Sequence, residues 1–302
     1  MVVDVRRRVV EYDYVRALAM LLVLFGHCYY FEIESGYGGC DYSGLFAPSV
    51  VSCLLSLAKS CVYSFHMPLF VALSGAVARD VLVGQLLIQG NTHLWYLPAL
   101  FLVFVIVWLL LRIQMGERTR LVLLLVLSVA SRLVSVRLVE LPMAYAFWFY
   151  AGYLFEKRRE AVDRALARRG PWPAFAAFAL SFAVLRALGG ASPLARVPAE
   201  YLAAGTGCVA SYALCTWAAA KGVLRGAVDW ASRRSMGIYL YSDPWNYLIL
   251  ALAAATFGPA AFCGVGFVAL FLSRLVLTTF AALLVDWVVR RVEATCTRLR
   301  SG

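Results

Sequence analysis

The chain has 302 residues, of which 63% are hydrophobic and only 15% are charged, and its formal net charge is +11. Its mean hydropathy is +0.78, and several windows of about twenty residues are almost wholly apolar. This composition excludes a soluble multidomain protein and indicates a chain that crosses a membrane several times. The positive charge does not indicate a nucleic-acid partner, because Lys and Arg are gathered in short segments between apolar runs.

The first apolar stretch, residues 12–31, carries two basic side chains on one face. Arg16 and His27 would project in nearly the same direction from a helix, about 16 Å apart along its axis. An ionisable group deep in a bilayer is costly unless paired or hydrated, so His27 is a candidate functional residue. Arg16 is either an anchor at the membrane surface or a guanidinium that binds a phosphate or carboxylate. Asp13, one turn earlier, is expected to pair with Arg16 or to stay solvated.

Charge and turn residues predict the topology of the next segments. Arg6, Arg7 and Arg8 precede the first stretch and place the N-terminus in the cytoplasm, whereas the loop 32–49 has acidic but no basic residues and belongs outside. A second span, 54–78, contains FHMPLFVALSG, in which Pro68 is expected to kink the helix beside His66. In the same string, Ser74 and Gly75 favour a close helix contact over a nucleophile.

The number of predicted spans disagrees with the predicted topology, and the disagreement arises between residues 78 and 93. Further spans are predicted near 93–111, 120–138, 143–155, 173–190, 199–220, 236–254 and 261–289, with the basic segments between them and both termini in the cytoplasm. About nine spans are readable, yet two cytoplasmic termini require an even number. Residues 81–92 would form a helix of roughly 18 Å, too short for a hydrocarbon core of about 30 Å. This segment is either re-entrant, or a helix is missing here.

The ionisable side chains in or beside the spans are the candidates for chemistry. The three histidines, His27, His66 and His93, all lie there, and histidine exchanges protons near neutral pH. His27 and His66 are expected at similar depth in one cavity; the alternative is structural histidines at helix contacts. Asp243, within IYLYSDPWNYLI, needs a partner or water at depth. Trp95 is either a membrane anchor or a substrate contact. The Cys and His spacings predict no metal site.

In order along the chain, these motifs resemble those of the integral-membrane acyltransferase family 3, whose members include O-acetyltransferases of bacterial surface polysaccharides. The resemblance rests on Arg16 and His27 with ten residues between them, FHMPLFVALSG at 65–75, HLWYLPALF at 93–101, FWFYAGYLF at 147–155 and SMGIYLYSDPWNYL at 235–248. It implies ten helices, so the helix that this chain lacks falls between residues 78 and 93. Many relatives have His where this chain has Ser242 and Asp243.

The resemblance implies a single integral-membrane acyltransferase domain over residues 1–302, folded as an all-α polytopic transmembrane helix bundle in the bacterial cytoplasmic (inner) membrane. It would move an acyl group, expected to be acetyl from acetyl-CoA, to a hydroxyl of a cell-surface or exported glycan or a lipid-linked saccharide. His27 would act as general base or as a transient acyl carrier, with Arg16 and His66 as the other catalytic residues. The expected substrate-binding residues are His93, Trp95, Asp243 and Asp13.

The expected partners are acyl-CoA, the acceptor glycan and membrane lipids, with no permanently bound cofactor, no metal and no nucleic acid. The alternative is a non-enzymatic transporter or exporter that uses the membrane-embedded histidines as proton relays. A third interpretation is an inactive member of the family that lacks one helix.

Overall fold

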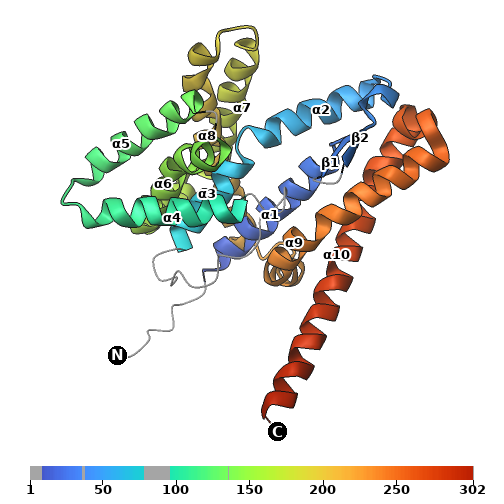
Figure 1. Cartoon of the computed structure of the whole chain (residues 1–302). Helices are drawn as coiled ribbons and strands as arrows, with labels where there is room; N and C mark the ends of the chain where they lie inside the picture. Colours follow the sequence, from blue (N-terminus) through green and yellow to red (C-terminus); the bar gives the residue numbers. More distant parts are fainter. Residues whose placement is uncertain (1–8, 36–37, 78–95, 135, 302) are drawn as a thin grey trace. The chain divides into compact units, whose positions relative to one another are not determined.

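The computed structural model describes residues 9–35, 38–77, 96–134 and 136–301, and these form helices joined by short turns and loops, with one short hairpin (Figure 1). The hairpin pairs β1 (Glu32–Ser35) with β2 (Gly38–Asp41) in antiparallel fashion. The predicted all-α class is therefore confirmed. The helices are α1 (Val10–His27), α2 (Val50–Tyr63), α3 (His66–Val77), α4 (Tyr96–Arg112), α5 (Glu117–Ala130), α6 (Arg137–Arg169), α7 (Trp172–Ala187), α8 (Pro193–Ala220), α9 (Arg225–Phe257) and α10 (Gly264–Ser301), with short 3-10 turns η1 (Ser43–Leu45), η3 (Ser131–Leu133) and η4 (Gly258–Phe262).

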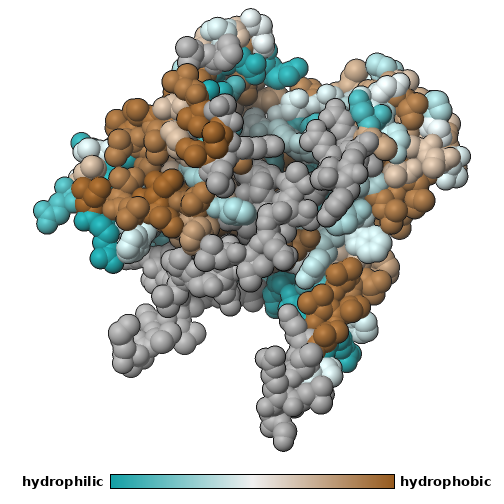
Figure 2. Space-filling view, in the orientation of Figure 1, coloured by the Kyte–Doolittle hydropathy of each residue, from teal (hydrophilic) through white to brown (hydrophobic). Residues whose placement is uncertain are grey.

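Among the described residues, four helical stretches are long and apolar enough to cross a membrane: Val50–Ala76, Ala195–Ala220, Arg225–Phe262 and Gly264–Val292. Two shorter apolar helices cover Pro98–Arg112 and Trp172–Ala187. Broad hydrophobic patches lie on the visible faces of α4, α5 and α10 in Figure 2. Exposed apolar surface on long helices is expected when the surrounding solvent is lipid. The chain is therefore a helical membrane protein.

The helices form two compact units, which are described separately. The first contains residues up to Arg16 and Ser64–Arg225, and the second contains Ala17–Tyr63 and Gly226–Gly302. Helix α1 contributes its first turns to the first unit and its remaining turns to the second.

Two predicted span boundaries are wrong. Helix α1 ends at His27 instead of continuing to Phe31. The second span is interrupted at Ser64 and Phe65, so the break precedes His66 and does not lie at Pro68. Proline is tolerated in the first turn of a helix, where its missing N–H has no helical acceptor, and Pro68 occupies this position in α3.

Two basic segments predicted as loops are instead continuous with helices. Residues 157–169 form the last turns of α6, and residues 225–234 form the first turns of α9. Lys and Arg are good helix formers, so a helix can continue beyond the apolar part that fits in the membrane. Hydropathy therefore predicts the part of a helix that lies in the hydrocarbon core, but it does not predict where the helix ends.

Close backbone contact joins α3 to α6 in the first unit. A Cβ atom on Gly75 would lie 1.9 Å from the carbonyl oxygen of Phe149, and one on Gly152 would lie 1.9 Å from that of Ala72. Only glycine allows two helix backbones to approach this closely. The Ser74 hydroxyl donates to Phe70 O within the same helix at 3.0 Å. The pair Ser74 and Gly75 thus belongs to a helix contact, as predicted.

In the second unit, apolar contacts hold α1 against α9 and α10. Met20 and Leu24 of α1 pack with Ile238 of α9, and Leu275 and Leu283 of α10 join this cluster. A second cluster, toward η4, joins the segment after α1 to the ends of α9 and α10; it contains Leu250, Ala261, Phe262 and Leu270, with Phe31, Tyr42 and Leu45 packed against it. The end of α1 lies between these clusters, where the polar residues of the unit gather.

Candidate functional site

His27 and Asp243 form a close polar pair in the second unit. Nδ1 of His27, the last residue of α1, lies 3.1 Å from Oδ1 of Asp243, near the middle of the apolar stretch of α9. The Asp243 side chain is 4% exposed and the His27 side chain 26%. A carboxylate beside Nδ1 favours the tautomer with its proton on that nitrogen, which leaves Nε2 as the basic atom. The pair can therefore accept a proton at Nε2 and stabilise the resulting imidazolium.

Two further polar residues of this site were missed by the sequence analysis. Arg274 of α10 and Asn246 of α9 are fully buried, and Arg274 Nε donates to Asn246 Oδ1 at 2.8 Å. Asn246 Nδ2 in turn donates to the carbonyl oxygen of His27 at 2.9 Å. An arginine inside the apolar string LFLSRLVLTTF is the same kind of signal that singled out His27, so Arg274 could have been found from the sequence. Asn246 lies within the motif at 235–248, but the sequence analysis assigned no role to it.

Tyr30 lies beside the imidazole, and Tyr63 and Lys59 lie beside Tyr30. The Tyr30 ring centroid is 6.2 Å from that of His27, and the Tyr63 centroid is 6.2 Å from that of Tyr30. Lys59 Nζ lies 4.6 Å from the Tyr30 centroid and 5.4 Å from the Tyr63 centroid, within cation–π distance of both. Gly26 provides room for this arrangement, because a Cβ there would be 2.7 Å from the Tyr63 ring. Lys59 was also missed, although it lies inside a predicted span.

Arg16 and Asp13 form the predicted pair on the first turns of α1. Arg16 Nη1 lies 3.8 Å from Asp13 Oδ1, and the side chains are 39% and 8% exposed, respectively. The alternative of a solvated Asp13 is therefore wrong, because the carboxylate is buried at this end of the helix. Arg16 remains partly accessible.

The structure does not test whether the remaining predicted site residues lie near His27. His66 is buried at the start of α3 in the first unit, so a shared cavity for His27 and His66 stays a prediction. His93 and Trp95 lie outside the described residues, as does the segment between 78 and 93 in which a helix was expected to be missing.

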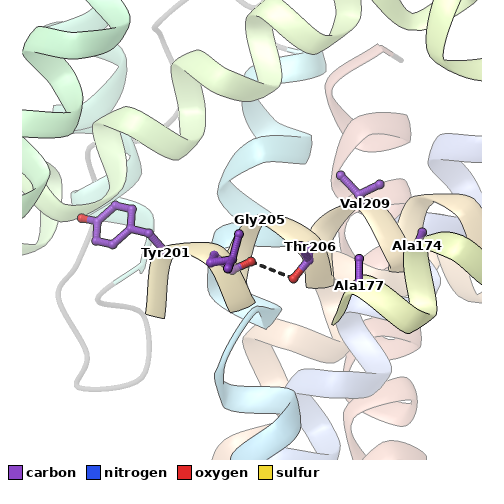
Figure 3. Close-up of a pocket in the computed structure, with 7 residues that line it drawn as sticks. Ala174, Ala177, Tyr201, Gly205, Thr206 and Val209 are labelled. Atoms are coloured by element: carbon purple, nitrogen blue, oxygen red, sulfur yellow. Dashed lines mark hydrogen bonds between the residues drawn. The ribbon is translucent and has the colours of Figure 1, made fainter. Parts of the chain in front are cut away.

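A surface hollow of about 260 Å³ lies between α7 and α8 in the first unit. Figure 3 shows Ala174 and Ala177 of α7 facing Gly205, Thr206 and Val209 of α8, with the Thr206 hydroxyl bonded to the backbone of its own helix. The lining residues carry no carboxylate, imidazole or basic group. This hollow offers no acid–base chemistry, so the candidate site remains the cluster around His27.

A family model described as an acyltransferase domain matches residues 79–287, more than two thirds of the chain. The chain belongs to the acyltransferase 3 family. The predicted family resemblance is thus confirmed, and the protein is a membrane acyltransferase by family. The match includes Asp243, Asn246 and Arg274, whereas Arg16, His27 and His66 precede it. No curated protein and no solved structure matches the chain.

Proposed function

We propose that this acyltransferase moves an acetyl group from acetyl-CoA to a hydroxyl of a cell-surface or exported glycan, in the bacterial cytoplasmic membrane, with His27 as its central catalytic residue. The observation that carries this proposal is the 3.1 Å contact between His27 Nδ1 and Asp243 Oδ1. A buried carboxylate that orients a partly accessible imidazole is the arrangement that general-base and nucleophilic acyl transfer both require.

The His27–Asp243 pair supports two balanced reaction routes. In the first, Nε2 removes the proton of the acceptor hydroxyl while its oxygen attacks the thioester carbonyl; the CoA thiolate leaves and takes that proton from the imidazolium. In the second, Nε2 attacks the thioester and CoA leaves as the thiolate, which gives an acyl-imidazolium. The acceptor oxygen then attacks the acyl carbon, the bond to Nε2 breaks and restores the neutral imidazole, and the hydroxyl proton passes to the CoA thiolate. Asp243 stabilises the positive charge on the ring in both routes.

Arg16 provides a contact for the donor at the cytoplasmic end of α1. Its guanidinium can form paired hydrogen bonds with the phosphates of CoA, which are the most strongly charged part of that substrate. The distance along the helix from Arg16 to His27 is about 16 Å, which an extended pantetheine arm can bridge. Asp13, bound to Arg16 without substrate, would hold the guanidinium in place.

The other side of the site is suited to a polar acceptor. Tyr30 lies near the imidazole, Tyr63 lies beside Tyr30, and Lys59 adds a positive charge over both tyrosine rings. Aromatic faces beside polar groups can contact both the apolar ring faces and the hydroxyls of a sugar. The chain continues from here into the β1–β2 hairpin, in the loop predicted to lie outside the cytoplasm.

The test uses purified protein in lipid nanodiscs with labelled acetyl-CoA and a glycan fraction from cells that express the gene. We expect release of the CoA thiol and label in the glycan with wild type, and loss of both with His27→Ala. Asp229→Asn, an acid on the same helix α9, serves as the control and should retain both activities. Proton movement in liposomes without any acylated product would support the transporter alternative and overturn the proposal.

A further inference from the structure

Helix α1 ends beside the long spans α9 and α10, and its last carbonyl groups lie within a low-dielectric environment. The final carbonyls of any helix lack helical partners, and in a bilayer core they cannot bond to bulk water. The string FGHCYYF at this end contains no glycine after the last helical residue and no proline that would terminate the helix locally. A local turn satisfies the last helical carbonyls in part, since Tyr29 N donates to Gly26 O and Tyr30 N donates to His27 O. The carbonyls that follow this turn need partners from elsewhere in the fold.

Arg274 provides partners for the last carbonyl of α1 and for two carbonyls that follow the helix. Its Nη1 donates to Cys28 O at 2.8 Å, and its Nη2 donates to Tyr30 O at 2.7 Å and to His27 O at 3.2 Å. Its Nε donates to Asn246 Oδ1 at 2.8 Å, and Asn246 Nδ2 reaches His27 O at 2.9 Å. A single guanidinium thus connects the end of α1 with both α9 and α10. A positive charge at the C-terminus of a helix is also favoured by the helix dipole.

We propose that Arg274 is a positioning residue: with Asn246 it clamps the backbone at the end of α1 and thereby sets the distance between the His27 imidazole and Asp243. Asp243 and Asn246 lie one turn apart on α9, so the clamp and the carboxylate share one helix face. A displacement of the clamped carbonyl moves the imidazole relative to Asp243. The effect on catalysis rests on the proposed function, but the clamp itself does not.

Two simpler roles for Arg274 do not fit its surroundings. It is no surface anchor, because it lies about 15 Å along α10 from Gly264 and its exposed fraction is 0%. It is no substrate contact in this structure either, because a side chain without accessible surface cannot touch a ligand. Lysine cannot reproduce the clamp, since its single nitrogen lacks the planar fork that reaches several acceptors at once.

The first readout is the steady-state kinetics of acyl transfer. We expect Arg274→Met to lower kcat at least tenfold with the KM for acetyl-CoA unchanged within a factor of two, and Arg274→Lys to recover part of the loss. Arg291→Met is the control, because Arg291 lies exposed on the same helix with its guanidinium over Trp287. An Arg274→Met variant with wild-type kcat would overturn the positioning role.

The second readout needs no activity and uses Cys28, which is only 2% exposed and whose carbonyl Arg274 holds. The probe is N-ethylmaleimide, applied to a protein in which Cys28 is the only cysteine. The residues changed to serine are Cys40, Cys53, Cys61, Cys208, Cys215, Cys263 and Cys296.

We expect slow labelling of Cys28 with the native arginine, labelling at least tenfold faster with Arg274→Met, an intermediate rate with Arg274→Lys and no change with Arg291→Met. Should Arg274→Met not give a monodisperse protein, Asn246→Ala removes one arm of the clamp and should accelerate labelling to a smaller extent. Equally slow labelling in a monodisperse clamp variant would overturn the clamp. Faster labelling in a protein whose wild type transfers no acyl group would uphold the clamp and reject the proposed function.

Discussion

His27 at the end of α1 and Asp243 in the middle of α9 lie 3.1 Å apart through Nδ1 and Oδ1. The two residues come from opposite ends of the chain, and both are held within apolar helices. In a membrane acyltransferase this pair is the part of the described structure best suited to proton transfer at a hydroxyl or to attack on a thioester.

Asp243→Asn should lower kcat by roughly 10²–10⁴-fold, because the amide retains the size of the side chain but loses the charge that stabilises the imidazolium. The KM for acetyl-CoA should stay unchanged. The comparison with His27→Ala is also informative: the double variant should be no slower than His27→Ala alone, since the two residues act as a unit. Additive losses in the double variant would show that Asp243 acts independently of His27.

Arg16→Gln should raise the KM for acetyl-CoA by roughly ten- to a hundredfold, the loss expected when a hydrogen-bonded charge is removed from a phosphate. The effect on kcat should be small, because Arg16 lies about 16 Å from His27. Arg118→Gln, which changes an exposed arginine of α5, is the control for a general loss of positive charge. If both variants raise KM to the same degree, Arg16 contributes only to the overall surface potential.

Gly75→Ala and Gly152→Ala should each lower the melting temperature, because the new Cβ would lie 1.9 Å from a backbone carbonyl oxygen and α3 and α6 would have to separate. Overpacking of this kind costs about 1–3 kcal/mol, and more where backbone must shift. Gly190→Ala is the matched control, since no heavy atom lies within 4 Å of a Cβ built there. Thermal unfolding in detergent would measure the difference, and equal melting temperatures for all three variants would contradict the close contact.

Gly26→Ala should displace the Tyr63 ring, because the new Cβ would lie 2.7 Å from it. The far end of a tyrosine can move, so we expect a change in acceptor recognition with little loss of stability. The KM for the glycan acceptor should rise while the KM for acetyl-CoA stays constant. An unchanged acceptor KM would exclude Tyr63 from the acceptor side of the site.

Residues whose interactions are local were predicted correctly from the sequence. Asp13 and Arg16 are one helical turn apart, so their pairing follows from helix geometry alone. His27 and Asp243 were each identified because ionisable groups inside apolar spans are costly. Their contact with each other could not be derived, because it depends on how α1 packs against α9. The all-α fold class was likewise predicted from hydropathy and composition.

The end of α1 shows why other features could not be predicted. No glycine or proline follows His27, and the carbonyls of Cys28 and Tyr30 accept hydrogen bonds from Arg274, which lies far along the chain. A cap that comes from tertiary structure leaves no pattern in the segment that it terminates. The lengths of α6 and α9 were underestimated for a related reason, because hydropathy reports the thickness of the membrane and basic residues continue a helix readily beyond it.

The most direct test of the central claim is the O-acetyl content of the surface glycan in cells that express wild type or His27→Ala at matched membrane levels, measured by mass spectrometry of the purified glycan. The account predicts acetylated glycan with wild type and a loss of at least about a hundredfold with His27→Ala, since the general base or acyl carrier is removed. Equal acetylation by both proteins would contradict the assignment of His27 as the residue that carries the acyl transfer.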